Sequence, residues 1–123
     1  MTPTIGDKGM KTIKWLTAIS LGLVALQPIS AGFFLSGFNH ASTAHMVVAV
    51  ALQLVVAIQC VTAIVLWRRH RLSLRDAGLG VGLFATVMLE AWAGRHMQFW
   101  LHLPIGVGIF VWLRGRRGKL AEW

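Results

Sequence analysis

Long apolar stretches alternate with short polar connections along the whole chain. Four such stretches can be read, over residues 13–38, 42–67, 77–93 and 99–113, and the last two are shorter than the first two. A helix needs about 20 predominantly apolar residues to cross a hydrocarbon core about 30 Å thick. The pattern therefore predicts four membrane-spanning helices.

The connections between these stretches are too short to let one helix cross over another. Neighbouring helices should therefore run antiparallel, which gives an all-α, up-down-up-down four-helix bundle as a single domain over residues 1–123. Gly37 and Asn39 are expected to break the chain between the first two helices. Ser42 or Thr43 is a candidate cap for the second helix, and Ser73 for the third.

Composition and charge support an integral membrane protein. Hydrophobic residues make up 56% of the chain and charged residues 13%, which is far from the composition of a soluble domain. The net charge of +8 could indicate nucleic-acid binding, but the basic residues cluster in three segments. These are residues 8–14, 68–75 and 114–119, which precede the first stretch, join the second to the third and follow the fourth; only Arg95 lies on the other side. This positive-inside pattern predicts that both termini are cytoplasmic, that the bilayer is the partner, and that nucleic acid is not.

Two histidines lie inside the apolar stretches. His45 is about one turn into the second predicted helix and His102 about one turn into the fourth, so both lie at a similar depth near the outer end. In a sequentially connected bundle, the second and fourth helices occupy opposite corners. The two side chains should therefore point toward each other across the core.

Opposed histidines of this kind suit the two axial positions of a haem iron. The other two helices must then be thin where the porphyrin passes, and Gly32 and Gly94 provide small residues near that depth. Arg95 is a candidate partner for the haem propionates. Two other interpretations stay open. The histidines could only make structural hydrogen bonds between helices, or they could bind zinc or copper with help from His40 or His96.

Glu90 lies in the third predicted helix at roughly the layer of the histidines, where an ionised carboxylate needs a partner. It could be a proton site near a cofactor or orient an axial imidazole. Alternatively, it could reach water or Arg95. Gln53 and Gln59, in the second helix, are expected to hydrogen-bond to other helices.

Two segments share a pattern of a polar residue, a small residue and a histidine on the next helix. They read "LQPISAGFF" followed by "TAHMVVAV", and "LEAWAGRHM" followed by "WLHLPIGVGIF". The pattern resembles one half of the haem A synthase bundle and, more loosely, the small four-helix b-type cytochromes of bacterial membranes, over roughly residues 26–110. The resemblance implies that His45 and His102 are the axial ligand pair. Haem A synthase has two such halves, whereas this chain has one.

Together these patterns predict a b-type cytochrome of a bacterial plasma membrane with one haem b per chain, near the outer leaflet. With both axial positions filled, the expected role is electron transfer with a quinol or an outer-side redox partner. No nucleophile with a base, paired carboxylates or phosphate-binding loop indicates catalysis. The alternative is an accessory or structural subunit that packs through "GLGVG" (residues 78–82). Whether copies of the chain form an oligomer is left open.

Overall fold

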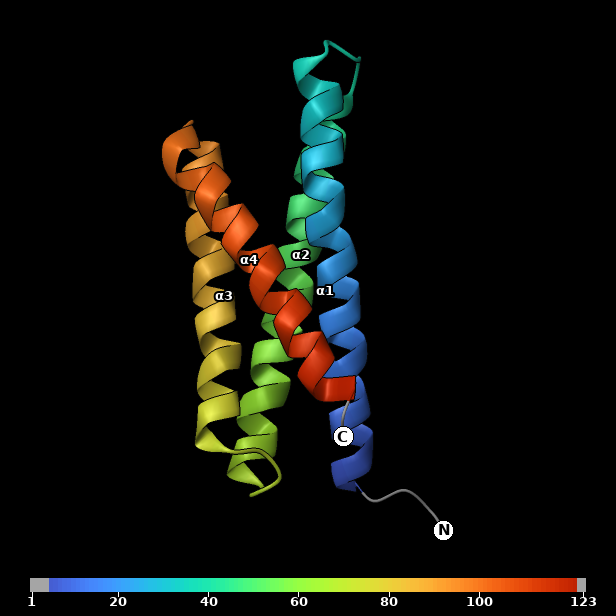
Figure 1. The fold of residues 1–123 in the computed structure, drawn as a ribbon, viewed down its shortest axis with the longest axis vertical. Helices are drawn as coiled ribbons and strands as arrows, with labels where there is room; N and C mark the ends of the chain where they lie inside the picture. Colours follow the sequence, from blue (N-terminus) through green and yellow to red (C-terminus); the bar gives the residue numbers. More distant parts are fainter. Residues whose placement is uncertain (1–4, 122–123) are drawn as a thin grey trace.

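The computed structural model describes residues 5–121 and contains four helices joined by short connections (Figure 1). These are α1 (Ile5–Leu35), α2 (Ala41–Arg68), α3 (Leu74–Arg95) and α4 (Phe99–Ala121). The expectation of an all-α chain with four helices is confirmed.

The helices pack in a closed order. Helix α1 contacts α2 and α4, and α3 contacts α2 and α4, whereas the described parts of α1 and α3, and of α2 and α4, do not pack against each other. Helices α2 and α4 therefore occupy opposite corners. Figure 1 shows that α4 runs obliquely to the other helices. The N-terminal end of α4 lies beside the C-terminal end of α3, and both diverge from α1.

The buried core lies between all four helices. Its largest cluster consists of Val24, Leu52, Val56, Leu83, Val87, Ile109 and Leu113. A polar contact lies deeper in the α1–α2 interface, where the side-chain amide Nε2 of Gln59 donates to Thr17 Oγ1 over 3.0 Å. Both of these side chains are fully buried. The expected role of Gln59 as an interhelical partner is confirmed.

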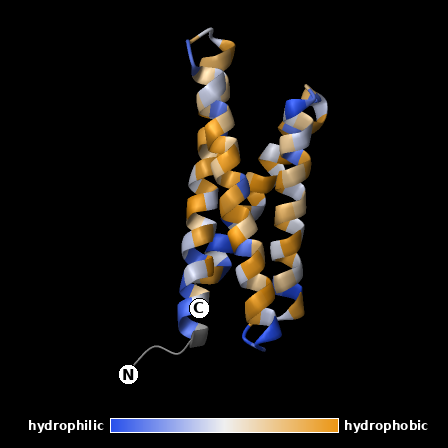
Figure 2. Cartoon of the chain, turned by 180° about the vertical axis from the view of Figure 1, so that it is seen from behind, coloured by the Kyte–Doolittle hydropathy of each residue, from blue (hydrophilic) through white to orange (hydrophobic). Residues whose placement is uncertain are grey.

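Large apolar side chains also cover the outside of the bundle. On α2, for example, Leu54, Ile58 and Val61 are each more than half exposed. Figure 2 shows apolar residues along the lengths of the helices and hydrophilic residues gathered toward their ends. An apolar exterior of this extent is unfavourable in water and is typical of a surface that faces lipid.

Three helices are long and apolar enough to cross a membrane: Asp7–Leu35 within α1, Ala41–Arg68 and Leu74–Arg95. Within residues 5–121, α4 does not meet this standard, so the expectation of four spans is met for three. The reason is the length of its apolar part. The helix continues past residue 113 into a basic segment that contains Arg114, Arg116 and Lys119, so only its first 15 residues are free of acidic residues, lysine and arginine.

The two predicted helix caps have different outcomes. Ser73 caps α3, because its hydroxyl accepts a hydrogen bond from the backbone N–H of Asp76 over 3.0 Å. The prediction for α2 is wrong: the helix begins at Ala41, so Ser42 and Thr43 already lie inside its first turn. His40 precedes the helix with a left-handed φ of 65° and makes no capping hydrogen bond through its side chain.

Gly37 has a φ of 78°, a conformation that glycine adopts without strain, and ends the turn after α1. The "GLGVG" segment packs within the bundle. A Cβ on Gly80 would lie 3.1 Å from Ala63 Cβ on α2, and one on Gly82 would lie 3.2 Å from the Trp112 ring on α4. These two glycines therefore lie at contacts between helices of the same chain, whereas a Cβ on Gly78 would have nothing within 4 Å.

Candidate histidine site

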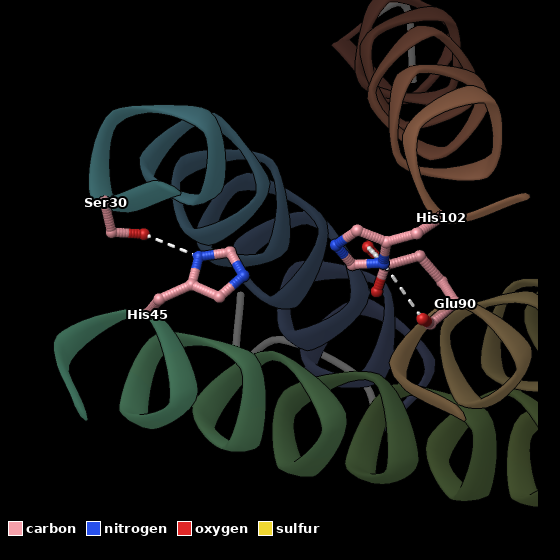
Figure 3. A network of polar contacts seen from close by, with 4 residues as sticks. All are labelled: Ser30, His45, Glu90 and His102. Atoms are coloured by element: carbon pink, nitrogen blue, oxygen red, sulfur yellow. Dashed lines mark hydrogen bonds and ion pairs between the residues drawn. The ribbon is translucent and has the colours of Figure 1, made fainter. Parts of the chain in front are cut away.

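His45 and His102 face each other across the bundle near the N-terminal ends of α2 and α4 (Figure 3). Their ring centroids are 6.3 Å apart and the ring planes are inclined by 77°. Both side chains are half-buried. The pair is formed by diagonal helices, which α1 and α3 hold apart by packing between them.

Glu90 on α3 holds the ring of His102. His102 Nδ1 lies 3.0 Å from the carboxylate Oε1 of Glu90 and 3.1 Å from the backbone carbonyl oxygen of the same residue. A carbonyl oxygen can only accept a hydrogen bond, so Nδ1 carries the proton in the neutral ring. The other ring nitrogen, Nε2, then has a free lone pair.

Ser30 on α1 holds the ring of His45 in the same tautomer. The Ser30 hydroxyl donates its only proton to the backbone carbonyl of Gln27 over 3.0 Å, and its oxygen lies 2.9 Å from His45 Nδ1. In this arrangement the oxygen accepts from an Nδ1–H group of His45, whose tautomer sets the direction of the contact. As in His102, this leaves the Nε2 lone pair of His45 free.

The two free nitrogens point into the space between the rings (Figure 3). Within residues 5–121, the side-chain hydrogen bonds of both rings are made through Nδ1. Metal-bound histidines usually have this arrangement, in which one ring nitrogen binds the metal and the other donates to a carboxylate, carbonyl or hydroxyl that fixes the ring. The hydrogen bonds thus leave Nε2 as the nitrogen that each ring turns toward the other.

The ring centroids are 6.3 Å apart, so the two imidazoles leave a space between them. Direct hydrogen bonding between the rings is excluded in this tautomer, because both Nε2 atoms would be acceptors.

Gly94 makes room for the ring of His102. A Cβ at Gly94 would lie 2.9 Å from Cε1 and 3.0 Å from Nδ1 of His102, closer than van der Waals contact allows. The imidazole therefore lies directly against the α3 backbone. Gly32, on α1, is exposed and has open space around its Cβ position. Arg95 is exposed at the end of α3.

A cavity of about 380 Å³ adjoins the site between α1 and α4. Apolar residues form most of its lining, and its polar groups are Gln27, Glu90 and His102. The amide Oε1 of Gln27 is buried and has no hydrogen-bond partner among the described residues. The volume lies within the range of about 300–1,000 Å³ that ligand pockets commonly have.

The remaining histidines near this end do not join the pair. His40 is exposed, and His96 is exposed with its Nδ1 2.8 Å from the Trp92 carbonyl oxygen and its ring stacked on the Trp92 indole. No group of three or more His, Cys, Asp or Glu side chains suited to a metal ion is present within the described residues. This part of the chain therefore gives no third protein ligand for the zinc or copper interpretation.

Ser30 is the one residue of the site that the sequence pattern does not indicate. Its signal is weak, because a serine in a membrane helix commonly bonds to the carbonyl of a residue three or four positions earlier in its own helix. Ser30 makes that bond as well. Its contact with His45 depends on how α1 and α2 are aligned, which the sequence does not show.

Comparisons with known proteins add no further information about this site. No family model matches the chain, and no curated protein or solved structure is significantly similar to it.

Proposed function

We propose that this protein is an integral four-helix bundle of the bacterial plasma membrane, with up-down-up-down helices and both termini in the cytoplasm. The three apolar helices and the lipid-like exterior support insertion. The apolar 15-residue part of α4 spans about 22 Å at about 1.5 Å per residue, and tilting, local thinning and extended arginine side chains accommodate such a short span. The distribution of basic residues supports the orientation.

Cysteine labelling tests this orientation. The single native Cys60 is buried, so an added cysteine provides nearly all of the signal. We expect a membrane-impermeant maleimide to label Ser36→Cys in spheroplasts but to label His70→Cys only after lysis. Labelling of both, or the reverse pattern, would contradict the proposed topology. Both positions are exposed in the structure, so burial cannot mimic protection by the membrane.

We propose further that the bundle binds one haem b per chain between His45 and His102, near the outer leaflet, and that it carries electrons to or from a quinol or an outer-side redox partner. One observation carries this proposal: two opposed imidazoles 6.3 Å apart, each with Nδ1 engaged and Nε2 free. Purely structural hydrogen bonding would not explain why both rings leave the facing nitrogens without partners.

The residues around the pair fit this role. Gly94 allows the ring of His102 to lie against α3, and Glu90 and Ser30 fix the tautomers. When bound, a haem would supply a one-electron redox centre. His45 and His102 would hold the group through their Nε2 atoms, and the surrounding helices would give it an apolar environment. Because two side chains of the protein would bind the iron, an electron-transfer role is favoured over binding of a further ligand.

Optical spectra of the detergent-purified protein, oxidised and then reduced with dithionite, test the haem proposal. We expect a Soret band with resolved α and β bands on reduction, which indicates six-coordinate low-spin iron. His45→Ala and His102→Ala should each abolish this spectrum. His40→Ala and His96→Ala are matched controls, because both rings are exposed and lie outside the pair, and they should retain it.

A colourless protein from cells with ample haem would refute the cytochrome proposal and favour the accessory-subunit alternative. A spectrum that survives both His45→Ala and His102→Ala would refute the ligand assignment. Helicity measured by circular dichroism separates loss of the cofactor from loss of the fold, since a folded, colourless His45→Ala protein still has four helices.

A further inference from the structure

A second cavity, of about 530 Å³, lies away from the histidine pair. It is formed by α1, the start of α3, the C-terminal part of α4 and the α2–α3 connection, and it shares no residue with the cavity beside His102. Its charged lining consists of Arg75, Arg116, Lys119 and Asp76. Three cations therefore face one carboxylate in this space.

Arg116 is the most informative of these residues. Its side chain is half-buried, and its Nη1 atom is buried without a hydrogen-bond partner among the described residues. Burial lowers the pKa of the guanidinium, and the charge of Asp76 raises it in part; arginine nonetheless stays protonated in proteins. A buried cationic N–H without an acceptor raises the free energy of the folded state, so a bound anion would stabilise this group.

Asp76 does not meet that need. Its carboxylate Oδ2 accepts a hydrogen bond of 2.6 Å from the Ser73 hydroxyl at the start of α3. Within residues 5–121, no ion pair joins Asp76 to Arg116. The carboxylate acts on Arg116 at longer range, and the cavity keeps an excess of positive charge.

The rest of the lining is largely apolar. Met10 and Ile13 of α1, Leu79 of α3, and Val111 and Trp112 of α4 contribute to it. A lining that combines basic groups with an apolar wall suits an amphiphile whose anionic group contacts the cations while its chain covers the apolar residues. A small hydrophilic anion would leave that wall uncovered.

We propose that this basic cavity binds a phosphate group, with Arg116 as its central donor and Arg75 and Lys119 beside it. Arginine suits this ligand because its planar guanidinium can donate two hydrogen bonds to phosphate oxygens. A phospholipid headgroup and free phosphate share this chemistry. The basic cavity goes beyond the proposed electron-transfer function and does not depend on it.

Native mass spectrometry of the full chain in dodecylmaltoside provides the test, with three probes: dioctanoyl phosphatidylglycerol, dioctanoyl phosphatidylcholine and inorganic phosphate. We expect one phosphatidylglycerol to bind per chain, and binding to become about tenfold weaker in Arg116→Gln, which loses charge-assisted hydrogen bonds. Arg117→Gln is the matched control. It removes the same charge from the next residue of α4, which is exposed and does not line the cavity.

Weaker binding by Arg116→Gln could also result from damage to the fold. Asp76→Asn separates the two explanations, because this variant should bind phosphatidylglycerol more tightly. The asparagine oxygen can still accept the bond from Ser73, while the negative charge beside the phosphate is removed. A damaged protein would not bind more tightly. Tighter binding of phosphatidylglycerol by Asp76→Asn, together with weaker binding by Arg116→Gln, supports the proposal.

The probes distinguish the two sources of phosphate. Preference for phosphatidylglycerol over inorganic phosphate assigns the site to an anionic lipid, whereas equal affinity for the two assigns it to free phosphate, and either result supports a phosphate site. Equal binding of all probes by wild type and Arg116→Gln would overturn the proposal. An equal loss in Arg117→Gln would also overturn it, since it would indicate general attraction to a basic surface.

Discussion

Replacing Gly94 by alanine gives the sharpest test of how the histidine site is built. The new Cβ would lie 2.9 Å from Cε1 and 3.0 Å from Nδ1 of His102. Ordinary van der Waals contact between such atoms needs about 3.5–4.0 Å, so the ring must move by about half an ångström or more. The ring cannot make this movement and keep both of its present bonds to Glu90, at 3.0 and 3.1 Å.

The size of the effect follows from two opposing terms. Loss of hydrogen bonding at Nδ1 costs about 1–3 kcal/mol. Replacing glycine by alanine in a helix returns about 0.5–1 kcal/mol, because alanine loses less conformational entropy on folding. The difference between the two ranges is a net cost of about 0–2.5 kcal/mol, with a midpoint of about 1 kcal/mol, which corresponds to a roughly fivefold change in an equilibrium constant.

The assay is haem retention during detergent purification, measured from the Soret absorbance per chain, together with thermal unfolding followed by circular dichroism. Gly108→Ala is the matched control, because Gly108 lies in α4 with nothing within 4 Å of its Cβ position. We expect Gly94→Ala to lose haem more readily than Gly108→Ala, which should match wild type. Equal retention by the two variants would refute the role assigned to Gly94 in seating the ring of His102.

Two further predictions concern buried polar contacts. Ser30→Ala removes the acceptor for His45 Nδ1 and should weaken haem retention about 10-fold or more, measured as above; unchanged retention would show that the hydroxyl does not orient the ring. Thr17→Val removes the partner of the Gln59 amide, whose own oxygen is already unpartnered among the described residues. It should lower the unfolding free energy by about 1–3 kcal/mol, whereas Gln59→Leu should cost less because it removes the buried amide altogether; equal losses in denaturation curves would contradict this.

Periodicity and charge predict much of the fold because each depends on local sequence. The apolar stretches place all four helices, and Ser73 marks the start of α3. The start of α2 escapes prediction because it depends on the left-handed conformation of His40, which side-chain chemistry does not dictate. The length of α4 is also not predicted by the apolar pattern, because a helix can continue beyond the end of an apolar stretch. Arginine, lysine and leucine favour helix, and α4 continues through them to Ala121.

In the candidate site, too, the features that depend on local sequence are predictable and those that depend on helix packing are not. Two histidines at similar depth on alternate helices indicate an opposed pair from sequence pattern alone, and the structure places the two ring centroids 6.3 Å apart. Glu90 could have met either His102 or Arg95, and only the structure shows that it contacts His102. Gly94 was expected to thin α3 for a macrocycle. It instead lies against the ring of His102, a contact set by the crossing of α3 and α4.

The two histidines reach the same tautomer through different partners, which makes the site chemically unequal despite the similar sequence around Gln27 and Glu90. At His102 the acceptors for Nδ1–H are the side-chain carboxyl group and the backbone carbonyl of Glu90, and at His45 the acceptor is a hydroxyl whose proton is directed to a carbonyl. A carboxylate acceptor raises the electron density of the imidazole more than a neutral hydroxyl does. The free Nε2 of His102 should therefore be a stronger electron-pair donor to a bound iron than the free Nε2 of His45. It follows that Glu90→Gln should affect the reduction potential of a bound haem more than Ser30→Ala does, a difference that potentiometric titration of the two variants would measure; a larger shift in Ser30→Ala would contradict this ordering.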